Sequence, residues 1–267
     1  MLRKKNLVVV GLTTFNTEML KISVSAIARI KSNFTLIIHN DNPNQTVTVR
    51  TIRKIGYRGR LHIINSTQNI GLRAARLRIL DAAGKYAPSA EWIIYIDDDD
   101  ILLSADIPSV GTNNFAVIQN SLVVRRRVSD LITATCQPQS LCPDGDNIVL
   151  MRPYLGLGAT AVRIDIMRAA ANILHAAGAR LDEIDASLEY RPPVDIMMWN
   201  ALNSYARHTD PNAAPIYMDS VNCIRNGIDS AAIKYGRPLT APRNSAAAVN
   251  RALARYDAVI SHAMSQF

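Results

Sequence analysis

The chain has 267 residues, of which 48% are hydrophobic, and its 30 Lys and Arg against 22 Asp and Glu give a net charge of +8. This composition excludes a disordered or fibrous protein and suits one large α/β domain. No apolar stretch approaches the roughly 18 residues of a membrane span, and too few apolar residues follow Arg3-Lys4-Lys5 for a signal peptide. We therefore expect a cytoplasmic protein, with peripheral contact to the inner face of a membrane as an option.

The cysteines and the net charge limit the classes of partner that we expect this chain to bind. Three cysteines without a C-x-x-C pair indicate neither a disulfide framework nor a zinc site. The positive charge suits nucleic acid, anionic lipid headgroups or a phosphate-rich small molecule. Because the basic residues are dispersed and only 6% of residues are aromatic, the stacking groove of a single-strand binder is not indicated. We predict no nucleic-acid partner.

Strand and helix patterns alternate through the first hundred residues. A near-continuous apolar run at 7–12 predicts a buried strand, and apolar residues at helical spacing over 18–30 predict its crossover helix. Further strands are predicted at 34–39, 61–64 and 92–96, and further helices at 47–54 and 71–83. This alternation predicts a mostly parallel central sheet flanked by helices, in which ligands lie beyond the carboxyl ends of the strands.

The second half gives a weaker pattern. Strands are predicted near 116–118 and 122–127, a variable loop region at 130–148, helices at 164–178 and from Asp195, and a terminal helix at 245–264. No internal repeat or clear linker divides the chain.

The fourth strand ends in four carboxylates, Asp97 to Asp100. Alternation along a strand would send Asp97 and Asp99 to one side and Asp98 and Asp100 to the other. Four adjacent negative charges repel unless a cation neutralises them, and hard oxygen ligands favour Mg²⁺ or Mn²⁺, with or without a phosphate. A solvated acidic turn is the plainer alternative.

Four blocks occur in a recognisable order. Residues 8–16 form a hydrophobic strand ending in T-F-N, Asp41 keeps the second Asp of a D-D-G-S block, residues 69–77 fit N-x-G-x-x-x-A-R-N except at Leu77, and residues 96–100 fit L-D-x-D-D. In this order they resemble a GT-A nucleotide-diphospho-sugar glycosyltransferase, similar to glycosyltransferase family 2. The resemblance is weaker at 156–163, at 194–199, where Asp195 lacks the family's preceding Glu, and at 222–230, which loosely resembles a late R-x-H-x-x-N loop without its His.

The resemblance implies a GT-A fold and a metal-dependent inverting glycosyltransferase that uses Mn²⁺ or Mg²⁺. The expected donor is a nucleotide-diphosphate sugar, with a UDP-sugar preferred, and the expected acceptor is a saccharide or a lipid-linked molecule. It also implies one catalytic domain over 1–240, with a nucleotide-binding half at 1–103 and an acceptor-side half at 104–240, followed by a C-terminal helical extension at 241–267.

Residue roles follow from the same resemblance. The expected nucleotide-sugar ligands are Thr13, Phe15, Asp41, Asn69, Arg76, Asp97 and Asp100. The expected metal ligands are Asp97, Asp99 and Asp229, and the expected base is Asp195, while Asp98 is expected to point away. Asp41 and Asn69 are equally typical of turns and helix caps, and Asp195 of an N-cap.

Two other classes of function compete. One is a catalytically inactive relative that binds a nucleotide, a metal or a partner, as the missing Glu and His suggest. The other is a Mg²⁺-dependent phosphoryl or nucleotidyl transferase. The second is less favoured because the first strand, 7–16, contains no Asp, and residues 13–17 lack a Gly-rich basic loop.

Overall fold

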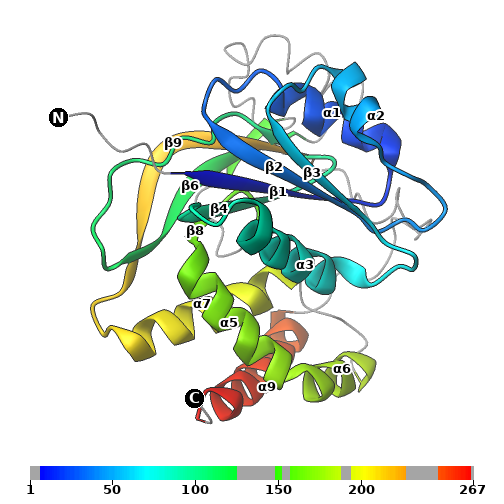
Figure 1. Ribbon diagram of the computed structural model, residues 1–267. Helices are drawn as coiled ribbons and strands as arrows, with labels where there is room; N and C mark the ends of the chain where they lie inside the picture. The colour runs from blue at the N-terminus through cyan, green and yellow to red at the C-terminus, as the bar shows by residue number, and fades with distance from the viewer. Residues whose placement is uncertain (1–6, 125–147, 152–156, 188–193, 227–245, 266–267) are drawn as a thin grey trace.

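The structure is a computed structural model that describes residues 7–124, 148–151, 157–187, 194–226 and 246–265 (Figure 1). Within these residues nine strands form one sheet in the order β3-β2-β1-β4-β8-β6-β9-β5, with β7 paired to β6. The strands are β1 (Val8–Thr14), β2 (Phe34–Asn40), β3 (Arg60–Asn65), β4 (Trp92–Asp97), β5 (Ile101–Leu102), β6 (Asn114–Val124), β7 (Ile148–Met151), β8 (Ala161–Arg163) and β9 (Ala214–Asn226). The helices are α1 (Thr17–Ile27), α2 (Val49–Ile55), α3 (Gly71–Tyr86), α5 (Ile164–Ala176), α6 (Gly178–Ser187), α7 (Val194–Thr209) and α9 (Ala246–Met264).

The first four strands of the order, β3-β2-β1-β4, are all parallel. Thr13 of β1 pairs with His39 of β2 on one side and with Asp97 of β4 on the other. The carboxyl ends of these strands are therefore level, and their polar end residues meet at one edge. The predicted α/β architecture, a helix-flanked sheet that is parallel through its N-terminal half, is confirmed.

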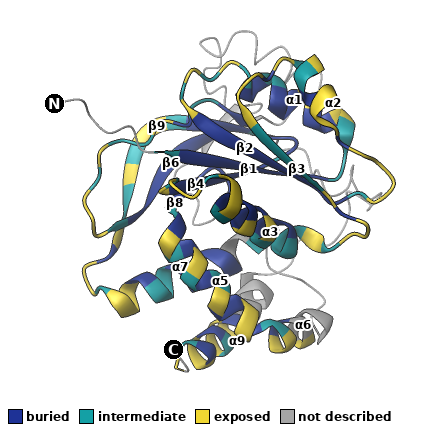
Figure 2. Ribbon diagram, in the orientation of Figure 1, coloured by how far each residue is buried: buried dark blue, intermediate teal, exposed yellow. Residues whose placement is uncertain are grey.

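Helices cover both faces of the sheet (Figure 1). Along β4, Ile94 and Ile96 pack in the apolar cluster under α1 and α2, while Ile93 and Tyr95 pack in the cluster formed with α3, α5 and α7. The central strands β1, β2 and β4 are accordingly dark in the burial view of Figure 2, whereas β3 is intermediate to exposed. Gly11 allows α3 to lie close to β1, because a Cβ at that position would stand 2.7 Å from Cγ2 of Ile79.

The second half of the sheet is mixed. Residues 116–118 and 122–124 of the two predicted strands belong to one long strand, β6, which pairs in parallel with β9 and antiparallel with β7 and β8. The rest of the second predicted strand, 125–127, lies outside the described residues. The prediction of a loop beginning at residue 222 is wrong for 222–226, which belong to β9. This segment is a strand because it has backbone partners on both sides, β6 and β5.

The terminal helix packs on the domain. Tyr256 and Ile260 of α9 are buried in the same apolar cluster as Trp199 of α7 and Ile173 of α5. None of the helices in the described part of the chain is long and apolar enough to cross a membrane.

Candidate active site

The four carboxylates follow β4 in a tight turn. Asp97 ends the strand, and the N–H of Asp100 donates to the carbonyl of Asp97 at 3.2 Å. Because the chain turns at Asp98 and Asp99, the alternation predicted for all four side chains does not extend past Asp98. Ser23 of α1, which the sequence did not single out, holds the turn: its Oγ lies 2.6 Å from the carbonyl oxygen of Asp98 and 2.7 Å from that of Asp100.

Asp97 lies on the α3 side, with a side chain that is 34% exposed. Oγ1 of Thr13 donates to its Oδ1 at 2.9 Å, and Nη2 of Arg76 approaches the same oxygen at 3.4 Å. Arg76 is fully buried, with its guanidinium carbon 5.6 Å from the centre of the Tyr95 ring. Burial raises the pKa of Tyr95, so its hydroxyl stays protonated and donates to the carbonyl of Arg76 at 3.3 Å. The fold thus brings together three of the predicted site residues.

Asp98 has a structural position. Its Oδ2 accepts hydrogen bonds from Oγ1 of Thr14 at 2.8 Å, from the N–H of Phe15 at 3.0 Å and from the N–H of Asn16 at 3.1 Å. The residue is fully buried. It therefore fixes the connection between β1 and α1, including the backbone of Phe15, and faces away from any ligand beside Asp97.

Asp99 and Asp100 are 4% and 7% exposed. The chain that follows them pairs with β9, so that Ile101 lies opposite Ile224. Burial raises the pKa of the Cys223 thiol well above its usual range, and the charges of Asp100 and Asp97 raise it further while that of Arg225 opposes them. Cys223 is accordingly a neutral thiol beside the carboxylates.

Asp41 and Asn69 meet at the N-terminus of α3. The two oxygens of Asp41 accept from the N–H groups of Ile70 at 2.8 Å and Gly71 at 2.9 Å, and Oδ1 of Asn69 accepts from Gly71 at 3.0 Å. The capping alternative therefore describes both side chains, although the helix capped by Asp41 is 30 residues further along the chain. Each carboxylate oxygen has a second lone pair, so a contact between Asp41 and a nucleotide stays compatible with this cap.

Amide side chains that the sequence reading missed connect the loops at this edge. Nδ2 of Asn40 donates to Oδ1 of Asn65 at 3.0 Å, and that oxygen also accepts from the N–H of Val47 at 2.9 Å. Nδ2 of Asn42 donates to the carbonyl of Phe15 at 2.9 Å. The signal was an asparagine at the end of each of two neighbouring strands.

His39 lies beneath these loops. It is fully buried, and its Nε2 is 3.2 Å from Oγ of Ser66. Burial lowers the pKa of His39, while the nearby carboxylate of Asp41 partly opposes this effect. The imidazole is therefore neutral at pH 7.

Strand β9 supplies a second wall, through a segment that only loosely resembles the late loop of the family. Arg225 donates through Nη2 to the carbonyl of Gly158, and a Cβ at Gly158 would collide with that guanidinium. Nδ2 of Asn222 donates to the carbonyl of Ala159 at 3.3 Å, and the N–H of Ala159 donates to the carbonyl of Tyr95 at 2.7 Å. Ala159 has φ of 59°, a left-handed conformation that costs a non-glycine residue about 1 kcal/mol or more. Residues 158 and 159 are thus held, under strain, beside the end of β4.

Two predicted residues cannot be placed beside this wall. Asp195 is the second residue of α7, but its side chain is not among those described, and Asp229 lies outside the described residues. The roles of base and third metal ligand therefore stay predictions.

The oxygen donors at this edge fit a hard divalent cation. Mg²⁺ is commonly bound by one or two carboxylates together with substrate phosphates, and Asp97 and Asp99 supply carboxylates of this kind. Among the described residues no group of three or more His, Cys, Asp or Glu side chains is placed to hold a metal by itself. A cation here would therefore need the phosphates of a ligand or a protein group beyond the described residues.

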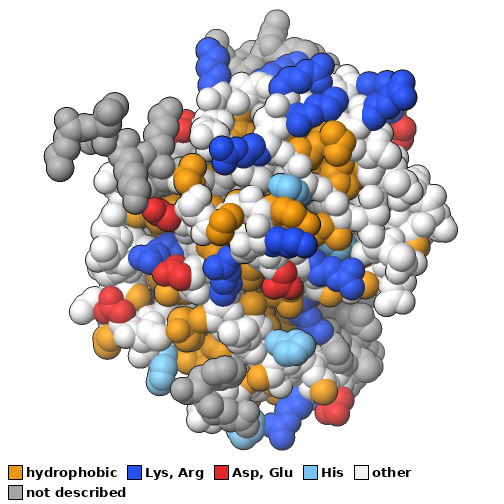
Figure 3. Space-filling view, in the orientation of Figure 1, with side chains coloured by type: hydrophobic (Ala, Val, Ile, Leu, Met, Phe, Trp, Pro, Cys, Tyr) orange, Lys and Arg blue, Asp and Glu red, His pale blue; other side chains and the backbone are white. Residues whose placement is uncertain are grey.

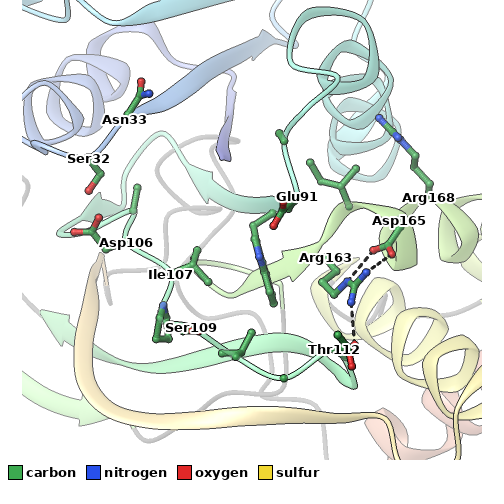
Figure 4. A pocket seen from close by; sticks show the side chains of 17 residues that line it. Ser32, Asn33, Glu91, Asp106, Ile107, Ser109, Thr112, Arg163, Asp165 and Arg168 are labelled. Atoms are coloured by element: carbon green, nitrogen blue, oxygen red, sulfur yellow. Dashed lines mark hydrogen bonds and ion pairs between the residues drawn. The ribbon is translucent and has the colours of Figure 1, made fainter. Parts of the chain in front are cut away.

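A large cavity lies elsewhere in the described part of the chain. It measures about 850 Å³ and is lined by the amino end of β4, the loop at 105–112 and the start of α5. Its charged wall is formed by Arg163, which pairs with Asp165 at 2.6 Å and donates to the carbonyl of Thr112 at 2.9 Å (Figure 4). These residues stand at the edge of the sheet opposite the aspartate turn.

Residues 9–110 match the family model of glycosyl transferase family 2. This chain is similar to that family. The match covers β1 to the loop after β5 and includes Thr13, Asp41, Arg76 and all four aspartates, so the resemblance inferred from four sequence blocks is confirmed. Comparison with curated protein sequences gives no match.

Several solved structures resemble this chain at low sequence identity. Residues 1–349 of TarS from S. aureus align over 94% of this chain and 70% of that chain, with 14% identity and a TM-score of 0.49; the chain covers 42% of a longer TarS structure. The mannosyltransferase PcManGT from Pyrobaculum calidifontis, solved with GDP-Man and Mn²⁺, aligns over 99% and 75%, with 12% identity and a TM-score of 0.48. Glucosyl-3-phosphoglycerate synthase from Mycobacterium tuberculosis aligns over 97% and 81%, with 15% identity and a TM-score of 0.45.

Proposed function

We propose that this family-2-like protein is a metal-dependent inverting glycosyltransferase, which moves a sugar from a nucleotide-diphosphate sugar to an acceptor hydroxyl in glycan or glycolipid synthesis. The observation that carries the proposal is the position of Asp97, held by Thr13 and Arg76 at the carboxyl ends of β1 and β4. This edge is where ligands of parallel α/β sheets bind, and it lies within the stretch that matches the family.

The donor would lie across this edge. Thr13, Phe15, Asp41 and Asn69 would border the nucleoside, and Arg76 would balance the charge of Asp97 and of the diphosphate. Phe15 and Asn69 stand on loops that the asparagine contacts and the α3 cap fix in place, which supports a preformed pocket. We propose a UDP-sugar as donor and a saccharide or lipid-linked acceptor; a lipid-linked acceptor would bring the protein to a membrane surface.

Asp97, Asp99 and Asp229 would hold Mn²⁺ or Mg²⁺. When bound, such a cation neutralises negative charge on a departing diphosphate. Asp100, buried beside Arg225 and Cys223, would support the site rather than form its surface. Asp195, at the start of α7, would accept the proton of the acceptor hydroxyl as general base.

The test is a binding and turnover screen over UDP-, GDP- and dTDP-sugars, with and without Mn²⁺ or Mg²⁺. Asp99→Ala should lose metal-dependent nucleotide binding at least 10-fold, whereas Asp195→Ala should bind the donor normally but lose transfer by about 100-fold or more. Asp106→Ala, an exposed carboxylate at the opposite edge, is the matched control and should change neither.

Each alternative function predicts a different result. Donor binding without hydrolysis or transfer for any sugar would indicate an inactive binding relative. Release of a nucleoside monophosphate or of inorganic phosphate, in place of a nucleoside diphosphate, would indicate phosphoryl or nucleotidyl transfer. Metal-independent binding that Asp99→Ala leaves intact would contradict the metal assignment.

A further inference from the structure

The positive charge of this protein is concentrated in one part of the chain. Residues 1–80 contain 14 Lys and Arg against two acids, Glu18 and Asp41, whereas residues 81–267 contain 16 Lys and Arg against 20 Asp and Glu. The excess of positive charge over the whole chain therefore comes entirely from the first 80 residues. Of their two acids, Asp41 is buried at the α3 cap and Glu18 pairs with Lys21 at 2.7 Å.

Six of these basic residues lie together on the α1 and α2 side of the sheet, and we call them the basic face: Arg29, Lys31, Arg50, Arg53, Lys54 and Arg58. The ends of the two helices are adjacent, since a Cβ at Gly56 after α2 would lie 4.0 Å from Cβ of Ala28 after α1. Figure 3 shows Lys and Arg side chains gathered over the part of the surface where Figure 1 places α1 and α2. All six residues except the half-buried Arg53 are exposed.

The fold needs only part of this charge. Arg53 donates to the carbonyl of Tyr57 at 2.9 Å and Arg58 donates to the carbonyl of Arg53, so these two residues fix the turn after α2. Lys31, Arg50 and Lys54 form no ion pair within the described residues. Like charges gathered without a structural function destabilise a surface slightly, and an anionic partner would remove that cost.

The composition of the face selects the kind of partner. Single-stranded nucleic acid would require exposed aromatic rings among the bases, but Tyr57, the aromatic residue beside Arg53, is only 4% exposed. The apolar residue that does protrude is Val49, 51% exposed and next to Arg50 at the start of α2. Basic side chains around a protruding aliphatic group suit an anionic lipid surface, which attracts the charges and accepts the apolar group.

We propose that the basic face docks this protein on membranes that contain anionic lipids. The proposal assigns residues to the peripheral contact considered with the proposed function, but it rests on the charge distribution and not on the activity. Each basic residue near such a surface strengthens binding by roughly five-fold. Binding should therefore weaken steeply with ionic strength, because salt screens exposed charges.

The experiment measures co-sedimentation of the whole chain with vesicles of phosphatidylcholine alone or mixed with phosphatidylglycerol. We expect binding to the mixed vesicles only, and a loss of about 100-fold in the triple variant Lys31→Gln, Arg50→Gln, Lys54→Gln. The matched control is Arg180→Gln, Arg207→Gln, Arg255→Gln, which removes three exposed Arg residues from the helices on the other side of the sheet and should bind as the unchanged protein does. Circular dichroism should show both variants folded, since all six side chains are exposed.

Three results would overturn the proposal. One is equal binding to both kinds of vesicle, and another is an equal loss in the two triple variants. The third is the absence of vesicle binding together with binding to single-stranded DNA, which would assign the face to nucleic acid. Because none of these measurements uses a nucleotide sugar, they are independent of the glycosyltransferase assignment.

Discussion

The two edges of the parallel half of the sheet are built in opposite ways. At the carboxyl edge, Asp97, Asp98 and Asp41 are held by hydroxyl, guanidinium and backbone donors. The amino edge has the cavity of about 850 Å³, and its Arg163–Asp165 pair is partly exposed. The cavity at the amino edge therefore does not coincide with the candidate site. The direction of the strands locates the candidate site, because parallel strands bring their polar ends and the helix N-termini to one edge of the sheet.

The largest predicted difference in stability between the two edges is for the substitution of one arginine at each edge. Arg76→Met removes a fully buried guanidinium beside Asp97, so the free energy of unfolding should fall by about 3 kcal/mol, and nucleotide binding should weaken at least 10-fold. Arg163→Met, at the amino edge, should cost less than about 1 kcal/mol because its pair with Asp165 is partly exposed. Urea unfolding and calorimetric titration measure the two quantities. Equal costs for the two variants would remove the distinction between the edges.

Aspartate to asparagine substitutions should likewise cost more stability at the carboxyl edge than at the amino edge. Asp98→Asn replaces a buried carboxylate that accepts three hydrogen bonds, and we expect a loss of about 2 kcal/mol. Asp106→Asn changes an exposed carboxylate and should cost less than about 0.5 kcal/mol. The measurement is the urea midpoint at constant m-value. A cost for Asp98→Asn as small as that for Asp106→Asn would mean that a neutral amide oxygen serves the Thr14 and backbone donors as well as the carboxylate does.

The contribution of the carboxyl edge to folding stability should also depend more strongly on acid pH than that of the amino edge. The pKa of His39 is lowered in the folded protein from its ordinary 6.5, mainly by burial. The folded state then binds fewer protons than the unfolded chain, so this contribution to stability is complete above pH 6.5 and is lost as the pH falls towards the folded pKa. The slope from one such group is at most about 1.4 kcal/mol per pH unit. In His39→Gln the stability curve below pH 6.5 should be flatter by that amount; curves that stay parallel would contradict the assignment.

The smallest expected effect is that of an alanine to glycine substitution, which should raise the stability at the carboxyl edge and lower it at the amino edge. Ala159→Gly relieves a left-handed alanine at the carboxyl edge and should stabilise the fold by about 0.5–1 kcal/mol. Ala90→Gly, beside the amino-edge cavity, has no positive φ to relieve and should destabilise by a similar amount through added freedom of the unfolded chain. Thermal unfolding followed by circular dichroism resolves shifts of this size. A destabilised Ala159→Gly would show that the methyl group, and not the backbone conformation, determines the effect.

The first half of the chain was predictable because its signals are local. Uninterrupted Val, Leu and Ile runs indicated β1, β2 and β4, helical spacing indicated α1 and α3, and each strand end carried its own polar residues. The second half was not predictable from local signals, because β9 is a strand through its pairing with β6, about a hundred residues away along the chain. The segment that contains Asn222 and Arg225 was therefore matched to a late loop of the family, whereas the structure has it as a strand.

The sequence by itself determined the α/β alternation and indicated the edge at which the candidate site lies and several of its candidate residues, because each depends on a periodicity of two or 3.6 or on a motif within ten residues. Only the tertiary structure decided which contacts each of those residues makes. It placed Arg76 and Thr13 on Asp97, directed Asp98 to the backbone of β1 and α1, placed Asp41 on α3 and brought β9 to the end of β4. The contacts of the aspartates join segments 21 to 84 residues apart, and β9 pairs with Ile101 from Ile224, 123 residues further along the chain. They follow from which strands are neighbours and how far each strand extends, and no local pattern in the sequence specifies either.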